Sequence, residues 1–122
     1  MNLVKIPESE LEIMKVIWNQ DSSISSKEII SLMEEKMNWK NTTTLTLLSR
    51  LTKKNFISSE KGNRITYYTA IVKEKDYLKL ETKDFLKKFY NNSIKNFITT
   101  LNENDDISNE DLDELKKWIN NR

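Results

Sequence analysis

The sequence predicts a mainly α-helical protein with a small β-hairpin. Apolar residues recur at helical spacing through most of the 122 residues, and β-forming residues are concentrated in residues 56–70. The chain also contains one glycine and one proline. A loop-rich or all-β fold would need more of both, because turns and bulges use them. A chain of this length forms one domain, or a small domain with a helical appendage.

Two short helices are expected in the first third of the chain. Pro7 suits the first turn of a helix, where its missing N–H has no partner to lose, and apolar residues at helical spacing extend this helix to Trp18. A second helix begins after Ser25, which forms a capping box with Glu28. Its apolar stripe continues to Met37.

A third helix is expected from Asn41, which is a good N-cap residue, to about Lys54. The buried stripe of this helix consists of Leu47, Leu48 and Leu51. Asn55 follows at a place where the chain often turns into the left-handed conformation, and Asn is the best residue for that after glycine.

The hairpin is predicted from two β-forming segments, residues 56–60 and 64–70. They flank Lys61-Gly62-Asn63, which contains the single glycine of the chain. We place Gly62 in the turn, because a tight hairpin requires residues with positive φ.

Helical periodicity returns after the hairpin. We expect helices over residues 75–89, over residues 93–101, and from Ser108, whose capping partner is Asp111. These residues follow the three helices and the hairpin, which already form a complete module. They carry too many apolar side chains to form a free tail. A contiguous apolar surface of this kind usually marks an interface.

The composition excludes several functions. The chain has no cysteine and no histidine, so disulfides, thiolate metal sites and the commonest catalytic base are absent. We expect no enzyme activity, no cofactor and no metal. The apolar runs are too short to span a bilayer and no signal peptide is visible, so we expect a cytoplasmic protein without membrane insertion.

Charge is segregated along the chain although the net charge is only +1. Between positions 40 and 67 the only acidic residue is Glu60. The same segment contains six basic residues, namely Lys40, Arg50, Lys53, Lys54, Lys61 and Arg64. Residues 103–114 carry seven acids and no base. A basic patch is expected of a surface that binds a polyanion, and an ordinary solvated face explains it equally well.

Three helices followed by a basic hairpin is the order of a winged helix-turn-helix, which protein-interaction domains share. In the DNA-binding form the third helix enters the major groove and the hairpin contacts the flanking backbone. On the third helix, the residues that face away from the leucine stripe or lie on its flank are Thr42, Thr43, Leu45, Thr46, Ser49, Arg50 and Lys53. At the wing tip we expect phosphate contacts from Lys61, Asn63 and Arg64, which could also form an ordinary exposed turn.

Leu45 is the unusual member of this set. It either packs on a neighbouring helix or contacts the methyl group of a thymine. The run Thr42-Thr43-Thr44 is partly explained by the chemistry of a helix start, and we favour DNA contacts from Thr43 and Thr46.

We therefore expect a winged-helix domain over residues 1–72 and a helical dimerisation domain over residues 73–122. The residues expected in the dimer interface are Tyr77, Phe85, Phe89, Phe97, Leu101, Leu112, Leu115 and Trp118. A two-fold dimer would set two recognition helices about one turn of DNA apart. The alternative is that this segment packs on the first helix of its own chain.

Several segments resemble one protein family. Residues 9–18 (SELEIMKVIW) resemble the opening helix of the penicillinase-repressor (BlaI/MecI) proteins. The recognition helix of that family and the strand after it are resembled by Trp39, Thr43 and residues 47–57. The last helix of the family is resembled by residues 108–115.

The resemblance implies a winged-helix N-terminal domain, a helical C-terminal dimerisation domain, and a homodimer that binds double-stranded inverted-repeat operators. It also implies repression of β-lactam resistance genes, which ends when a membrane-sensor pathway leads to cleavage of the repressor by a protease.

The chain departs from the family pattern at several positions. Relatives usually carry a basic residue at the position of Thr42, a long polar residue at that of Leu45, and often glycine at that of Asn55. The family's scissile bond is an Asn-Phe pair, and counting back from the last helix places it at Thr100-Leu101, while Asn96-Phe97 lies four residues earlier. Copper-responsive relatives use C-terminal cysteines, which this chain lacks, so copper sensing through that motif is excluded.

Two other functions fit the same sequence. One is a winged-helix regulator of another gene set that responds to a small-molecule effector. The other is a winged-helix protein-interaction module that never contacts DNA.

Overall fold

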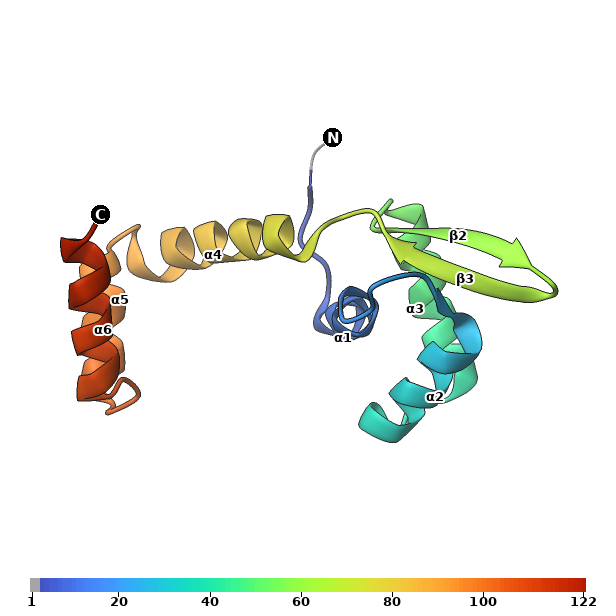
Figure 1. Ribbon diagram of the computed structural model, residues 1–122, viewed down its shortest axis with the longest axis horizontal. Helices are drawn as coiled ribbons and strands as arrows, with labels where there is room; N and C mark the ends of the chain where they lie inside the picture. The colour runs from blue at the N-terminus through green and yellow to red at the C-terminus, as the bar shows by residue number, and fades with distance from the viewer. Residues whose placement is uncertain (1–2) are drawn as a thin grey trace. The chain divides into compact units, whose positions relative to one another are not determined.

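The computed structural model describes residues 3–122, which form six helices and a three-stranded antiparallel sheet (Figure 1). The elements are α1 (Glu8–Trp18), β1 (Ile24–Ser25), α2 (Ser26–Met37), α3 (Asn41–Lys53), β2 (Ile57–Gly62), β3 (Ile65–Ala70), α4 (Glu74–Tyr90), α5 (Ile94–Glu103) and α6 (Asn109–Asn120). The mainly helical fold with a small hairpin is therefore confirmed. The chain divides into two compact units, one ending at Leu80 and one from Glu81 to Arg122.

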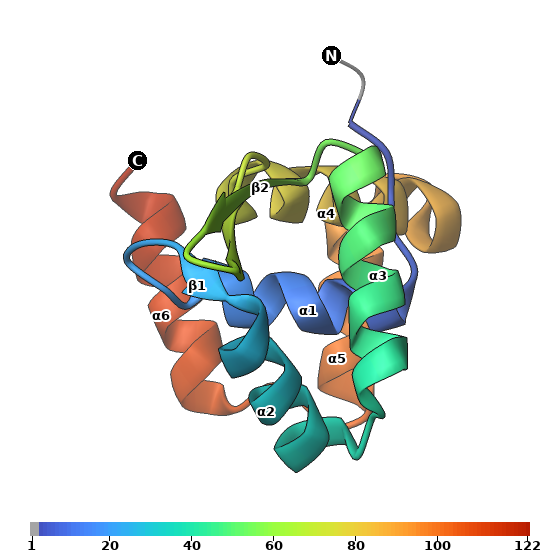
Figure 2. The ribbon, with the colours of Figure 1, turned by 90° about the vertical axis from the view of Figure 1, so that its right-hand side faces the viewer.

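The first unit has its core between α1, α2, α3 and one face of the sheet, as Figure 2 shows for the three helices and the hairpin. The leucine stripe predicted for α3 is buried, and Ile13 and Met14 of α1 and Ile29 and Met33 of α2 are fully buried opposite it. Apolar burial of this kind contributes roughly 1.5–3 kcal/mol per side chain. It fixes which face of α3 points to solvent.

The sheet has the strand order β1-β3-β2. β2 and β3 pair along their whole length, from Ile57 opposite Ala70 to Gly62 opposite Ile65. β1 has only two residues, and Ile24 pairs with Tyr68. This strand was not predicted, because two residues show no alternation. It attaches the α1–α2 connection to the hairpin.

The hairpin turn differs from the prediction. Gly62 is the last residue of β2 and its φ is not positive, whereas Asn63 and Arg64 have φ values of 46° and 68°. Two central residues with positive φ define a type I′ turn, whose twist matches that of the flanking strands. Asn adopts this conformation readily, and Arg64 is held in it because Gly62 and Ile65 close the ladder beside the turn.

Two predicted helix caps are confirmed. The Ser25 hydroxyl accepts a hydrogen bond from the Glu28 N–H at 3.2 Å, and the Ser108 hydroxyl accepts one from the Asp111 N–H at 3.0 Å. Each serine satisfies an N–H group that the first turn leaves without a helical partner. These local signals place the starts of α2 and α6.

The ends of α3 were predicted with partial success. The N-cap is Lys40, which makes no side-chain cap bond, and Asn41 is already the first helical residue, so the prediction of Asn41 as N-cap is wrong. At the other end Asn55 has a φ of 61°, as expected. The Phe56 N–H donates to the Leu51 carbonyl at 3.0 Å, which closes the helix in a Schellman arrangement.

Tyr77 was predicted in the dimer interface and lies instead in the core of the first unit. Its side chain is completely buried, and its ring centroid lies 5.7 Å from that of Phe56 and 6.0 Å from that of Trp18. The first unit accordingly continues past the expected end at Val72 to Leu80. Periodicity showed a helix here, but it does not show which part of the chain each turn packs against.

The second unit contains the C-terminal part of α4 with α5 and α6. Phe85 lies at its centre, with ring centroids of Phe89, Tyr90 and Phe97 at 5.3, 5.7 and 5.9 Å. None of residues 81–122 is fully buried in the single chain. Phe89 is 63% exposed and Trp118 60% exposed.

Candidate nucleic-acid interface

The outward face of α3 carries the side chains that the sequence singled out. All seven are exposed, namely Thr42, Thr43, Leu45, Thr46, Ser49, Arg50 and Lys53. The threonine run is divided, because Thr44 is completely buried. The burial of one face of the helix therefore leaves the other face exposed, and that face is polar except for Leu45.

A shallow hollow lies on this face. It is lined by Thr42, Thr43, Thr46, Leu47 and Arg50. Hydroxyl groups can donate to or accept from base edges and phosphates, and a guanidinium can bind guanine or phosphate with two parallel hydrogen bonds. The hollow therefore combines groups that can form hydrogen bonds with a fixed positive charge.

Leu45 is 44% exposed and does not belong to the core. The first of its two interpretations, burial against a neighbouring helix, would require a much smaller exposed fraction. Thr42, three residues earlier, and Ser49, four residues later, are also exposed, so Leu45 shares their surface.

The wing tip presents Lys61, Asn63 and Arg64 together. All three are exposed, Lys61 near the end of β2 and the other two in the turn. Within residues 3–122, no ion pair or side-chain hydrogen bond engages Lys61 or Arg64, and the same holds for Arg50 and Lys53 on α3. These charges are free to bind an anion.

Lys54 behaves differently from the neighbouring Lys53. Its ammonium group forms a salt bridge of 2.5 Å with Glu10, a carboxylate of α1 that is only 1% exposed. A carboxylate buried to this degree requires a partner. This contact could not be predicted from the sequence, because Glu10 is 44 residues away from Lys54 and resembles an ordinary acid in the first turn of a helix.

Glu12 forms a second ionic link, between α1 and α2. Its carboxylate lies 3.0 Å from the Lys36 ammonium and 3.3 Å from that of Lys15. The hydrogen bond from Lys36 is the main cause that holds the pKa of Glu12 below its ordinary value. This link joins α1 to α2 and involves none of the cations of α3.

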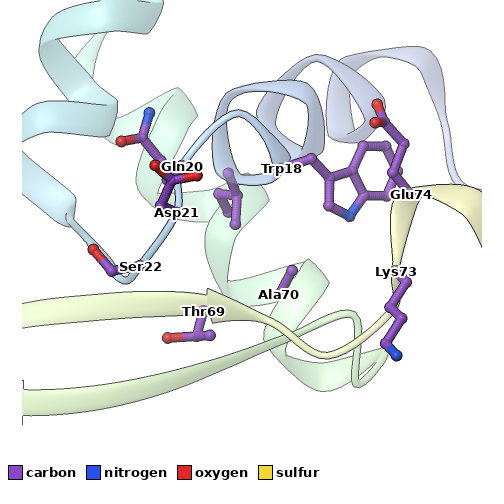
Figure 3. Close-up of a pocket in the computed structure, with 9 residues that line it drawn as sticks. Trp18, Gln20, Asp21, Ser22, Thr69, Ala70, Lys73 and Glu74 are labelled. Atoms are coloured by element: carbon purple, nitrogen blue, oxygen red, sulfur yellow. The ribbon is translucent and has the colours of Figure 1, made fainter.

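A second hollow of the first unit contains none of the predicted site residues. Figure 3 shows Trp18, Gln20, Asp21 and Ser22 from the end of α1 and the turn after it, Thr69 and Ala70 from β3, and Lys73 and Glu74 from the start of α4. The Trp18 indole N–H donates to the Val72 carbonyl at 2.8 Å, which fixes its ring at the end of the wing. The rim of this hollow carries both acidic and basic side chains, unlike the basic surface of α3.

Among the described residues, no group of three or more carboxylates could hold a metal ion. No helix in this part of the chain is long and apolar enough to cross a membrane.

The family model described as penicillinase repressor matches residues 6–121. The chain belongs to the penicillinase repressor family. The penicillinase repressor of Bacillus licheniformis is 37% identical over 78 residues, which are 64% of this chain and 60% of that protein. The methicillin resistance regulatory protein MecI of Staphylococcus aureus (strain N315) is 36% identical over 72 residues, 59% of this chain and 58% of its own length.

Solved structures of family members confirm the winged-helix fold of the first unit. The solution structure of the DNA-binding domain of the repressor BlaI is 40% identical, has a TM-score of 0.56, and covers 60% of this chain and 88% of that one. The monomeric form of Bacillus licheniformis BlaI in complex with the blaP half-operator is 37% identical with a TM-score of 0.54, over 62% of this chain and 92% of that one. The curated relatives named above are matched over about three-fifths of their length.

Proposed function

We propose that this protein is a transcriptional repressor that binds double-stranded operator DNA through α3 and the wing. The observation that carries this proposal is the exposed face of α3, where hydroxyl groups and unpaired cations lie together, followed by further unpaired cations at the wing tip. The likeness to a BlaI structure determined on a half-operator supports it. No enzyme chemistry is proposed, since the family is one of repressors.

In this account α3 enters the major groove, which is wide enough to admit a helix. Thr43 and Thr46 contact base edges, with Thr42 and Ser49 beside them, and Arg50 and Lys53 contact bases or phosphates at the flank. Lys61, Asn63 and Arg64 contact the backbone next to the groove. Backbone contacts supply affinity and orientation, and base contacts supply the sequence preference.

We infer from the relatives that the repressed genes confer resistance to β-lactams. The matched relatives are a penicillinase repressor and a methicillin resistance regulatory protein. Such genes would carry an operator with two-fold symmetry if the protein is a dimer.

The second unit is the proposed dimerisation domain. Its apolar side chains are exposed or only half-buried in the single chain, which favours a partner surface made by a second copy. The proposed contacts are Phe85, Phe89, Phe97, Leu101, Leu112, Leu115 and Trp118, without Tyr77. A dimer would place two copies of α3 on successive half-sites of an inverted repeat.

Proteolysis in the second unit, through a membrane-sensor pathway, is the proposed route of inactivation. Both candidate bonds, Asn96-Phe97 and Thr100-Leu101, lie inside α5. The Thr100 hydroxyl also donates to the Asn96 carbonyl at 2.9 Å. A protease binds an extended chain, so cleavage at either bond requires local unwinding of α5.

Paired wing variants test the proposed function. Replacing Lys61 and Arg64 with Gln should weaken binding to all DNA sequences by a similar factor and lower the salt dependence by about one unit per removed phosphate contact. Lys75→Gln, in α4, is the matched control for a lost surface charge. If the protein is instead a protein-interaction module, neither variant will change its binding to DNA.

A further inference from the structure

Leu45 occupies a position that differs from that of every other exposed apolar side chain of the first unit. Among the described residues, the others with large exposed fractions are Val4, Leu32, Met37, Tyr67, Ile71 and Leu78. None of them lies in α3 (Asn41–Lys53). A single exposed leucine needs no explanation elsewhere on a surface, but Leu45 lies on the helix that the winged-helix fold presents to the major groove.

The chemistry of Leu45 limits what it can recognise. Its side chain can neither donate nor accept a hydrogen bond. Most groups on the base edges of the major groove are donors or acceptors, and the apolar exception is the 5-methyl group of thymine. Leucine placed against a donor or acceptor would remove water from that group without replacing its hydrogen bond. Leucine placed against the thymine methyl buries apolar surface on both sides.

We propose that Leu45 is a specificity-determining residue that contacts the 5-methyl group of one thymine in each half-site. The proposal rests on the proposed function, since it assumes that α3 reads DNA. Thr42 and Ser49 on the same surface accept or donate, and so they fit several bases. Leu45 fits only thymine, and it therefore sets the base preference at the position that it contacts.

Substitution of deoxyuridine for thymidine tests this contact, because it removes the methyl group and keeps every hydrogen-bonding group. Short duplexes are first selected by the full-length protein from a random-sequence library, and each thymine of the selected site is then replaced in turn. For the unaltered protein we expect one position per half-site at which the replacement weakens binding about threefold to fivefold, as expected for one methyl group leaving an apolar contact. For Leu45→Ala, replacement at that position should have no effect.

Two further variants make the result specific. Leu45→Met keeps an apolar side chain and should retain the sensitivity to deoxyuridine. Leu32→Ala, a leucine of similar exposure that lines a hollow between α1 and α2, should leave the pattern of the unaltered protein unchanged.

The outcomes separate this inference from the proposed function. If no sequence is selected from the library, the proposed function itself is wrong. If a site is selected but no thymine responds to removal of its methyl group, or if Leu45→Ala responds as the unaltered protein does, the inference about Leu45 is overturned and the proposed function stands.

Discussion

The Tyr77 hydroxyl accepts a hydrogen bond from the backbone N–H of Ile6 at 2.9 Å, in the buried interior of the first unit. This bond joins the segment before α1 to the start of α4. The Tyr77 ring also meets Phe56, the residue at which α3 leads into the wing. The first turns of α4 are therefore part of the winged-helix unit and connect α3, the wing and the N-terminal segment through Tyr77.

Truncation tests this role of Tyr77. A chain that ends after Leu80 should unfold cooperatively, whereas a chain that ends after Val72 should be less stable by at least about 3 kcal/mol, the usual loss when a large aromatic side chain leaves a core. Urea unfolding followed by circular dichroism compares them. Tyr77→Phe in the full chain keeps the ring and should lose only about 1 kcal/mol, for the hydrogen bond. Equal stability of the two truncated chains would contradict the assignment.

Lys54→Gln should destabilise the protein, although Lys53→Gln should not. Lys54 is the ion-pair partner of the buried Glu10, and its removal leaves a carboxylate without a counter-charge. Since the Lys54 side chain is one-third exposed, water compensates in part, and we expect a loss of about 1–3 kcal/mol. For the exposed Lys53 we expect a change within about 0.5 kcal/mol. Denaturant midpoints of the two variants give the comparison, and equal midpoints would show that the salt bridge contributes nothing.

Thr44→Val should stabilise the protein. The Thr44 hydroxyl is completely buried and has no hydrogen-bond partner within residues 3–122, which is unfavourable by about 1–3 kcal/mol. Valine has nearly the same shape and no polar atom. We expect a higher melting temperature and an unchanged affinity for DNA, because Thr44 does not lie on the exposed face of α3. A lower melting temperature would mean that the hydroxyl has a partner in solution.

The ion pair of Glu12 and Lys36 should make stability depend on pH in acid. The pKa of Glu12 is lower in the folded protein than its ordinary value of 4.5, so the unfolded chain takes up the proton first. The contribution of the ion pair to stability is complete above pH 4.5. It is lost as the pH falls through the lower pKa that Glu12 has in the folded protein. The stability difference between the unaltered protein and Lys36→Gln, measured by urea unfolding, should therefore shrink in that window. A difference that stays constant with pH would exclude the effect.

Phe89→Asp should produce a folded monomer if the second unit forms the dimer. Phe89 is 63% exposed in the single chain, so a charge there is tolerated by the fold but is unfavourable in an apolar interface. Sedimentation of the unaltered protein should give a dimer, and that of the variant a monomer that binds half-sites. Lys79→Asp, an exposed α4 residue of the first unit, controls for the added acid. Dimers from both variants would contradict the proposed interface.

Local signals in the sequence were sufficient for most of the fold. The leucine stripe of α3 and the capping serines Ser25 and Ser108 act within four residues of their partners, so they can be read without knowing the tertiary structure. The exposed face of α3 followed directly, since it is the opposite of the stripe.

The features that were missed depend on contacts between distant residues. The pairing of Glu10 with Lys54 and the burial of Tyr77 involve partners that only the folded chain brings together. The turn was placed one residue too early, because glycine is the commonest residue with positive φ, whereas here Asn63 and Arg64 adopt it.

The central claim is that α3 and the wing read operator DNA, and the most direct test is the affinity of the full-length protein for its own upstream promoter across a salt series. Scrambled duplexes of the same composition provide the comparison. We predict tight binding that prefers the promoter by about a thousandfold or more and weakens steeply with salt, as phosphate contacts require. Equal and weak binding to both duplexes at every salt concentration would contradict the account.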